Sequence, residues 1–334
     1  MSRILTGDRP TGKLHLGHYV GTLKNRIKLQ NEYETFIIVA DLHTLTTKPE
    51  KEHIQKIDEN IRQLMLDYLA CGLDSKKVIF YRQSQVPEVT YLYLLFSMLV
   101  TIERAKRIPT LKDVIRDQKI KAASVGLLSY PILQSADILM VRANLVPVGR
   151  DQESHIELTR EIAQRFNTMY GETLPIPEAL IGNESITLVG TDGKSKMSKS
   201  LNNCIYLSDS SEEVKKKIMS MYTDPKRIHG NEPGTVEGNP VFIYHDIFNS
   251  NKVEVADLKS RYQKGAVGDV EVKEKLAAAI NSFLDPIRKK RAEFEKDPEL
   301  IKRILAEGTA KARAEAQKTL ELAKKAMGLT KLTE

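Results

Sequence analysis

Short apolar runs alternate with amphipathic segments through the first half of the chain. The clearest run is Thr35–Ala40, which ends at Asp41 and is typical of a strand covered on both faces in a parallel sheet. Apolar residues then recur at helical spacing from Ile54 to Tyr68, and Gly72 stands where a helix cap belongs. The same pattern predicts strands over residues 3–7, 77–81 and 145–148, and helices over residues 15–30, 88–101 and 151–169.

From about Ser208 onward the pattern is helical, with few strand candidates. Ser210 and Glu213 have the spacing of a capping box, which predicts a helix that runs to Tyr222. Residues 223–239 are rich in Gly, Pro and Asn and predict a loop. Helical patterns follow, and the last of them predicts a long helix over residues 298–327.

Strands and helices that alternate over short links predict an α/β fold with a Rossmann-like, doubly wound parallel sheet. We place this domain at residues 1–206 and an all-α domain at residues 207–334, with the last helix packing back on the first domain. A chain of 334 residues is long enough for two domains. Ligands of such sheets bind beyond the carboxyl ends of the strands, where His15, Asp41, Gln83 and Gly149 fall.

Composition narrows the class of protein. Hydrophobic residues make up 41% and charged residues 28%, and no apolar run is long enough to span a bilayer. The first residues lack the extended apolar stretch of a signal peptide. Cys71 and Cys204 lie far apart without metal-type spacing, so we expect free thiols in a cytoplasmic protein, with Cys71 in a helix core.

The net charge of +7 permits an anionic partner such as nucleic acid but does not demand one. The charge is spread along the whole chain rather than gathered in one segment. The local basic clusters at residues 215–217 and 288–291, each taken alone, are better explained as solvated helix faces.

Two short motifs carry the candidate chemistry. His15-Leu16-Gly17-His18 stands where the first predicted strand turns into a helix, a place suited to nucleotide phosphates. Lys196-Met197-Ser198-Lys199-Ser200 is a cationic segment that could close over the same phosphates. We therefore predict one ATP site that is shared by both motifs.

The residue types in these motifs suit charge on phosphorus. His15 and His18 are three apart on one helix face, where imidazole N–H groups could stabilise a phosphate as pyrophosphate leaves. Gly17 between them allows close approach of a nucleotide to the backbone. The turn Asp8-Arg9-Pro10-Thr11-Gly12 offers amides, and Ser198 and Ser200 offer hydroxyls. Gly190 and Gly193 suit a mobile loop ahead of the second motif.

The two motifs resemble the signatures of class I aminoacyl-tRNA synthetases. Longer strings narrow the resemblance to the bacterial tryptophanyl-tRNA synthetases, and it covers essentially the whole chain. These strings are Gly7-Asp8-Arg9-Pro10-Thr11-Gly12, Val146-Pro147-Val148-Gly149-Arg150-Asp151-Gln152, His155-Ile156-Glu157-Leu158-Thr159-Arg160 and Ala326-Met327-Gly328-Leu329.

The resemblance implies a reaction and a set of partners. ATP, with Mg²⁺ on its phosphates, would activate L-tryptophan, and the acyl group would move to the 3′ end of tRNA(Trp). It implies no metal ligands from the protein, a homodimer, and a helical C-terminal domain that reads the anticodon. The catalytic residues carried over are His15, His18, Lys196 and Lys199. The ATP-binding residues carried over are Arg9, Pro10, Thr11, Gly17, His18, Gly149, Arg150, Asp151, Thr187, Lys196, Met197, Ser198, Lys199 and Ser200.

We predict that a helical stripe of Tyr130, Gln134 and Asp137 recognises the amino acid. Asp137 lies among apolar residues, and a buried carboxylate needs a donor, which the indole N–H of tryptophan would supply. The alternative is a structural carboxylate paired with a basic side chain such as Arg142. The tryptophan-binding residues that the resemblance implies are Asp137, Tyr130, Gln134, Gln152, His43, Leu5 and Gly7.

Gln134 departs from the tryptophan enzymes, many of which carry Met there, and resembles the tyrosyl-tRNA synthetases instead. Leu5 argues against tyrosine, because tyrosine enzymes usually place a Tyr at this point of the first strand. A further alternative is a synthetase-like protein that senses tryptophan or tRNA without charging it. The intact His and Lys motifs argue against that alternative, because a protein that only binds has no chemical need for them.

Overall fold

The computed structural model describes residues 2–117, 120–149, 152–181, 187–224, 227, 229 and 231–329. It contains five parallel strands in the order β3-β2-β1-β4-β5. Their bounds are β1 (Arg3–Asp8), β2 (Glu34–Val39), β3 (Val78–Arg82), β4 (Leu145–Val148) and β5 (Glu178–Ile181). The order reverses between β1 and β4, so the switch point of a doubly wound sheet falls beside the end of β1.

Helices make up most of the rest of the described chain. In chain order they are α1 (Leu16–His18), the π-helical turn η1 (Tyr19–Leu23), α2 (Lys24–Leu29), α3 (Asp41–Leu45), α4 (Lys51–Ile54), α5 (Ile57–Cys71), the 3-10 turn η2 (Gln83–Gln85), α6 (Glu88–Ser97), α7 (Ile102–Lys106), α8 (Pro109–Asp117), α9 (Val125–Met140), α10 (Glu153–Tyr170), α11 (Ser211–Met219), α12 (Pro240–Phe248), α13 (Lys252–Gln263), α14 (Asp269–Glu295) and α15 (Leu300–Ala326). None of the described helices is both long and apolar enough to cross a membrane.

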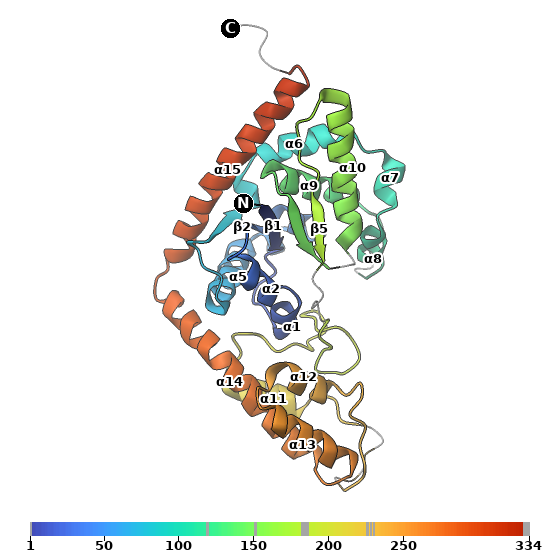
Figure 1. The fold of residues 1–334 in the computed structure, drawn as a ribbon, viewed down its shortest axis with the longest axis vertical. Coiled ribbons are helices and arrows are strands. Elements are labelled where there is room, and N and C mark those ends of the chain that lie inside the picture. The colour runs from blue at the N-terminus through green and yellow to red at the C-terminus, as the bar shows by residue number, and fades with distance from the viewer. Residues whose placement is uncertain are drawn as a thin grey trace.

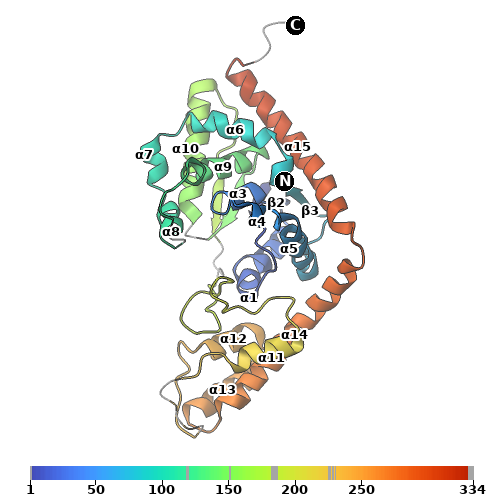
Figure 2. The ribbon, with the colours of Figure 1, turned by 180° about the vertical axis from the view of Figure 1, so that it is seen from behind.

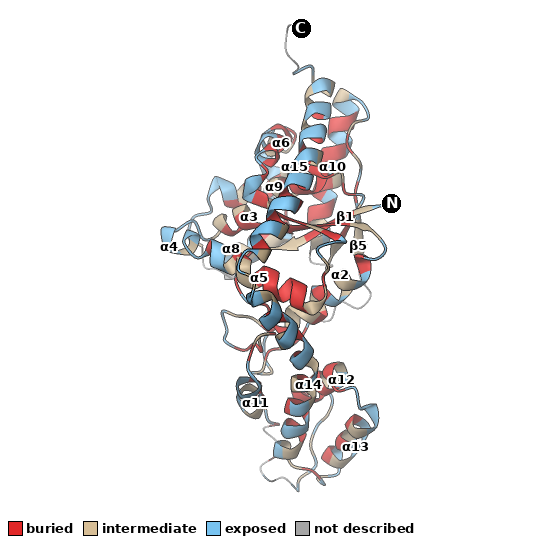
Figure 3. Cartoon of the chain, turned by 90° about the vertical axis from the view of Figure 1, so that its left-hand side faces the viewer, coloured by how far each residue is buried: buried red, intermediate tan, exposed pale blue. Residues whose placement is uncertain are grey.

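Both faces of the sheet are covered, as the apolar strands predicted. Along β2, Ile37 and Val39 join one buried cluster with α5, while Phe36 and Ile38 join a second cluster with α6, α9 and α10. This alternation follows from the period of two in a strand. Figure 3 shows the buried residues gathered in the strands and in the helix faces that meet them.

The molecule is elongated (Figure 1). The sheet and its helices form one end, helices α11 to α14 form the other, and α15 returns along the sheet. The final helix lies against the edge strand β3, where a glycine permits close approach of the two backbones. A Cβ on Gly308 would lie 1.8 Å from the carbonyl oxygen of Phe80, and the neighbouring Thr309 hydroxyl accepts a hydrogen bond from the Arg82 amide.

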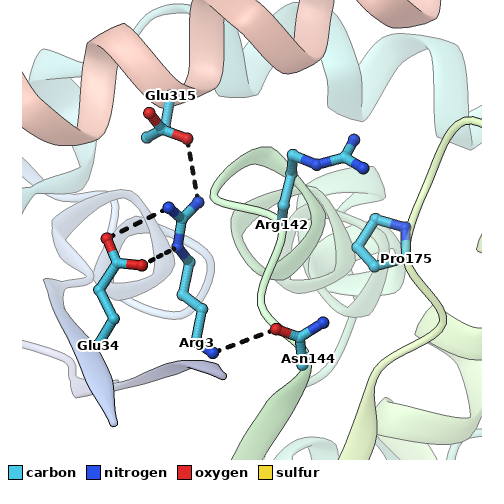
Figure 4. Close-up of a pocket in the computed structure, with 6 residues that line it drawn as sticks. All are labelled: Arg3, Glu34, Arg142, Asn144, Pro175 and Glu315. Atoms are coloured by element: carbon cyan, nitrogen blue, oxygen red, sulfur yellow. Dashed lines mark hydrogen bonds and ion pairs between the residues drawn. The ribbon is translucent and has the colours of Figure 1, made fainter. Parts of the chain in front are cut away.

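Side-chain ion pairs fix α15 at the amino ends of the strands (Figure 4). The Arg3 guanidinium bonds Glu34 of β2 and Glu315 of α15, each at 3.0 Å. These residues line a cavity of about 330 Å³ together with Arg142, Asn144 and Pro175. The cavity lies at the opposite end of the strands from His15, which follows the carboxyl end of β1.

Most predicted elements are present, with shifted ends. The helix predicted over residues 15–30 contains a π-helical turn, and the one predicted from Ile54 is broken between α4 and α5. Gly72 caps α5 in the left-handed region, with φ of 109°, and Ser210 with Glu213 forms the predicted capping box. Cys71 is half-buried against the core rather than fully inside it.

Candidate active site

The two motifs lie side by side because residues 205–207, which follow the second motif, pair with residues 14–16 at the start of the first motif. The Leu16 amide donates to the Ile205 carbonyl at 3.0 Å, and the Leu207 amide donates to the Leu14 carbonyl at 2.9 Å. Between these bonds His15 and Tyr206 form an antiparallel bridge. In both ribbon views these loops lie between the sheet and the C-terminal helices, next to α1 (Figures 1 and 2).

A direct contact joins the motifs themselves. The Gly17 amide donates to the sulfur of Met197, which is 2% exposed, at 3.3 Å. A Cβ on Gly17 would lie 3.0 Å from the His15 ring and 3.4 Å from the Met197 Cβ. A side chain at this position would crowd His15 and Met197, so protein packing favours glycine here, in addition to the close approach of a ligand that the sequence suggested.

The segment before the second motif is packed tightly. A Cβ on Gly190 would lie 2.1 Å from the side-chain nitrogen of Asn203. Gly193 adopts φ of +69°, and a Cβ there would lie 2.9 Å from the side chain of Tyr222. The Asn203 side-chain oxygen in turn accepts the Ser198 amide at 2.7 Å. These two glycines thus allow the loop to fold back on itself, which is a different reason from the mobility we expected.

Lys199 reaches across to the turn of the first motif. Its Nζ donates to the Thr11 carbonyl at 3.1 Å, the Thr11 hydroxyl at 3.0 Å and the Gly12 carbonyl at 3.2 Å. Lys196, by contrast, is exposed, and the Ser198 and Ser200 hydroxyls bond each other at 3.0 Å. The structure thus brings one of the two predicted catalytic lysines to the turn at residues 8–12, which we call the nucleotide turn after the ligand that the sequence predicts for it.

His15 and His18 form a close pair of neutral imidazoles whose rings are tilted by 47°. Their ring centroids are 3.8 Å apart, and the His15 amide donates to Nδ1 of His18 at 3.2 Å. Burial lowers the pKa of His15 to about 2 and that of His18 to about 4, and the charges of Lys199 and Lys196 act in the same direction. Because Nδ1 of His18 accepts a hydrogen bond, its proton lies on Nε2, which is free to donate.

A buried ion pair fixes the start of the turn. Asp8, at the end of β1, accepts bonds from Arg26 at 2.6 Å and from the Tyr68 hydroxyl at 2.6 Å. Burial would raise the pKa of Asp8, but the Arg26 guanidinium outweighs it and holds the pKa below its usual range. Arg26 also donates to the Gly7 carbonyl and the Thr6 hydroxyl. The carboxylate therefore stays charged and anchored beside the motif.

Asp137 is buried and already has two donors in the described structure. The Gln83 amide nitrogen lies 2.9 and 3.0 Å from its two oxygens, and His43 Nε2 lies 2.9 Å from one of them. Burial raises the pKa of Asp137, and these two donors oppose the shift. The pairing with Arg142 that we considered is wrong, because Arg142 donates to the Thr173 carbonyl instead.

Tyr130 connects this carboxylate to the nucleotide side. Its hydroxyl lies 3.1 Å from the Thr110 hydroxyl, and its ring stands edge-on to His43 with centroids 6.3 Å apart. Burial raises the pKa of Tyr130, against the Thr110 hydrogen bond and the charge of Arg9.

The other predicted residues are placed as follows. Gln134 and Gln152 are half-buried, Leu5 and Pro10 are buried, and Arg9, Thr11 and Thr187 are exposed. Gly7 packs so closely on β2 that a Cβ would lie 2.0 Å from the Ile38 carbonyl oxygen. Gly149 follows β4 as expected, whereas Arg150 and Asp151 lie outside the described residues.

Several residues of this region were not predicted to act in it. In the sequence, only the position of Gln83 just after a strand indicated a role, and nothing indicated a role for Thr110. Asp67 and Tyr68 of α5 also hold the turn, and their only signal was a polar residue within an otherwise apolar stretch of helix.

The geometry agrees with the comparisons to known proteins. The family model for class I tRNA synthetases (W and Y) matches residues 1–285. The chain belongs to this family of class I tRNA synthetases, in which the letters denote tryptophan and tyrosine. It is 56% identical over 330 residues to the tryptophan–tRNA ligase of Treponema pallidum, with 99% of this chain and 98% of that protein covered. It is 58% identical over 330 residues to the tryptophan–tRNA ligase of Borreliella burgdorferi, with 98% and 94% covered.

Solved structures are similar over the whole chain. The tryptophanyl-tRNA synthetase of Campylobacter jejuni, complexed with ADP and tryptophan, has a TM-score of 0.86 at 34% identity and covers 98% of this chain and 99% of that one. A tyrosyl-tRNA synthetase of Archaeoglobus fulgidus with L-tyrosine has a TM-score of 0.64 at 25% identity, with 87% and 90% covered. The fold is therefore common to both specificities.

The histidine pair generates a pH prediction. Because the pKa values of His15 and His18 lie far below the usual value of about 6.5, neither imidazole should titrate between pH 5 and 8 in the free protein. Two-dimensional ¹⁵N NMR of the histidine rings, assigned with His15→Gln and His18→Gln, should show His18 as the Nε2–H tautomer throughout.

The sign of the stability effect follows. Below about pH 6.5 the unfolded chain binds protons at these histidines, while the folded chain stays neutral down to the lowered pKa values. The free energy of unfolding therefore decreases as the pH falls below about 6.5. A titration midpoint near 6.5 for either ring in the folded protein would contradict the assignment.

Proposed function

We propose that this protein is a tryptophan–tRNA ligase. It activates L-tryptophan with ATP to tryptophanyl-adenylate and pyrophosphate, and it transfers tryptophan to the 3′ end of tRNA(Trp). The observation that carries the proposal is the meeting of both signature motifs on one turn, in a chain more than half identical to tryptophan–tRNA ligases over nearly its full length.

The activation step needs no nucleophile from the protein. A carboxylate oxygen of tryptophan attacks the α-phosphorus of ATP, the bond to the bridging oxygen breaks, and pyrophosphate leaves with that electron pair. Catalysis then consists of holding the two substrates in line and stabilising the added negative charge. Donors that are fixed beforehand serve this better than flexible ones, because they need no reorganisation during the reaction.

The nucleotide turn and the two motifs supply such donors. The neutral His18 would donate Nε2–H to a phosphate oxygen, and Lys199 would exchange its carbonyl partners for the leaving pyrophosphate. Lys196, being exposed, would join when the loop closes on ATP. His15 would complete the catalytic set beside them. We assign ATP binding to Arg9, Pro10, Thr11, Gly17, His18, Gly149, Arg150, Asp151, Thr187, Lys196, Met197, Ser198, Lys199 and Ser200.

Mg²⁺ is proposed as the counter-ion that neutralises the phosphates of ATP. Among the described residues, no group of three His, Cys, Asp or Glu side chains is placed to hold a metal ion. Phosphate oxygens are ligands that Mg²⁺ prefers, so we propose that the ion enters with ATP.

Asp137 is proposed to receive the indole N–H of tryptophan. A carboxylate has about four lone-pair sites, and three short contacts from Gln83 and His43 leave room for one more donor. These two residues fix the orientation of the carboxylate before tryptophan arrives. Tyr130, Gln134, Gln152, His43, Leu5 and Gly7 are proposed to line the same pocket.

We propose that residues 1–206 form the catalytic domain and residues 207–334 the tRNA anticodon-binding domain. The whole described sheet lies before residue 182, and the described chain after residue 207 is helical with loops, which supports the division. The last helix belongs to the second segment in sequence but packs on the sheet. Since ATP and tRNA are its substrates, we place the protein in the cytoplasm.

We further propose a homodimer that forms through the outer face of α6. Tyr91, Leu94 and Met98 lie at helical spacing on this face and are 42%, 52% and 68% exposed. Ile102 continues the apolar surface with 59% exposure. Several exposed apolar side chains grouped in this way are typical of a protein interface.

A charge on this face should separate the subunits. Met98→Glu should sediment at the mass of one chain, 37.7 kDa, while the unchanged protein sediments at twice that mass. Val253→Glu is the matched control, because Val253 is 81% exposed on α13, away from the proposed interface. If Met98→Glu dimerises as strongly as the unchanged protein, the interface does not include this face.

Amino-acid-dependent exchange between ATP and pyrophosphate tests the function directly. We expect the purified protein to catalyse exchange with tryptophan and not with tyrosine. Exchange only with tyrosine would identify the protein as a tyrosyl-tRNA synthetase, as Gln134 suggested. No exchange with any amino acid would favour a sensing protein without charging activity.

Asp137→Asn tests the proposed indole contact. The KM for tryptophan in exchange should rise by roughly tenfold, because a charged acceptor is lost, while the KM for ATP changes little. Asp224→Asn is the control, since Asp224 is a buried carboxylate of the C-terminal segment that accepts the Thr235 amide at 3.0 Å. Equal rises in both constants for Asp137→Asn would assign this carboxylate a structural role only.

A further inference from the structure

Two consecutive residues of α5 hold the two ends of the nucleotide turn. The Tyr68 hydroxyl donates to Asp8 at the start of the turn, and Asp67 Oδ2 accepts the Leu14 amide at its end, both at 2.6 Å. Asp67 and Tyr68 are both 0% exposed. A rigid helix thus sets the distance between the ends of the segment that carries Arg9 to Gly12.

The middle of the turn has less support of its own. The Thr11 amide donates to the Arg9 carbonyl at 2.8 Å, and Gly12 adopts φ of +90°. The Thr11 and Gly12 carbonyls face Lys199 of the second motif. Because these carbonyls are the partners of a proposed catalytic lysine, a shift at either end of the turn would displace Lys199 as well.

The second oxygen of Asp67 binds a residue from far along the chain. Arg291 of α14 donates to Asp67 Oδ1 at 2.9 Å, and the two residues are 224 positions apart. Arg291 is 5% exposed and also contacts the side chains of Gln63 and Glu295. Helix α14 packs on α5, and it also packs on α11 and α12 (Figure 2).

The chemistry of the pair explains why both members are needed. Burial raises the pKa of Asp67 to about 6, and the charge of Arg291 and the Leu14 amide oppose that shift. A charged carboxylate makes a shorter and stronger bond to an amide than a neutral group does, which agrees with the 2.6 Å contact to Leu14. Removing Arg291 would leave a buried carboxylate without its counter-charge.

We propose that Asp67 and Arg291 are positioning residues for ATP, which fix the nucleotide turn through the Leu14 amide. Arg291 keeps the Asp67 carboxylate charged and oriented, and the placement of α14 thereby determines where the turn stands. The inference rests on the proposed function, because ATP is taken as the ligand of that turn. Neither residue touches the substrates.

Steady-state exchange with Arg291→Met tests the proposal. The KM for ATP should rise by roughly five- to twentyfold, as expected for losing a hydrogen bond that involves charge, while the KM for tryptophan stays within about twofold. Arg291→Lys keeps the charge and should restore most of the ATP affinity. Arg313→Met is the matched control, since Arg313 of α15 pairs with the buried Glu88 at 2.9 Å, away from the turn, and it should leave the KM for ATP unchanged.

Asp67→Asn provides the same test from the other side of the pair if Arg291→Met does not fold. One oxygen becomes an amide, so either the Leu14 or the Arg291 bond is lost, and the KM for ATP should again rise alone. An unchanged KM for ATP, or equal rises for ATP and tryptophan, would overturn the positioning role.

A second readout separates this inference from the function itself. If the unchanged protein shows no exchange with tryptophan, the proposed function has failed. Calorimetric titration of ATP into the unchanged protein, Arg291→Met and Arg313→Met then still reports on the turn. Weaker ATP binding in Arg291→Met alone supports the inference, and equal binding in all three proteins overturns it.

Discussion

Residues 14–16 and 205–207 pair as short extended segments, and the candidate active site depends on this pairing. It joins two segments that are almost 200 positions apart and satisfies backbone groups that would otherwise be buried without partners. The contact of Gly17 with Met197 and the reach of Lys199 to Thr11 are possible only because this pairing sets the spacing. The pairing itself is made of backbone groups, and carboxylates hold it from both sides, because Asp67 accepts the Leu14 amide and Asp209 accepts the Tyr206 amide.

Around this backbone frame, the electrostatics favour an anion. The imidazoles of His15 and His18 are neutral, while Lys196 and Lys199 bring positive charge to the same place. The nearest acidic groups, Asp8 and Asp67, are each neutralised by an arginine. A triphosphate that enters therefore meets donors and cations rather than exposed carboxylates.

Much of this architecture follows from local sequence. Strands β1 to β4, the amphipathic α5 and the capping box at Ser210 are encoded in neighbouring residues, and they were predicted correctly. The π-helical turn after His18, the strand β5 and the helices α7 and α8 were not predicted, because short elements have weak periodicity.

The candidate site was also predictable only in part. The members of each motif are adjacent in sequence, so they could be recognised from it. Gln83 meets Asp137 across 54 positions, and Arg291 meets Asp67 across 224, which depends on how the helices pack. The crowding of Gly190 by Asn203 could not be predicted, because that contact exists only in the folded chain.

The contact between α15 and β3 has a consequence for how the protein is made. β3 is an edge of the parallel sheet, and an open edge invites pairing with other chains. The helix that covers this edge is the last one in the described sequence, so a ribosome completes the sheet long before its cover emerges. During that interval the nascent chain exposes a strand edge together with apolar residues of the sheet, which is the condition under which incomplete chains aggregate.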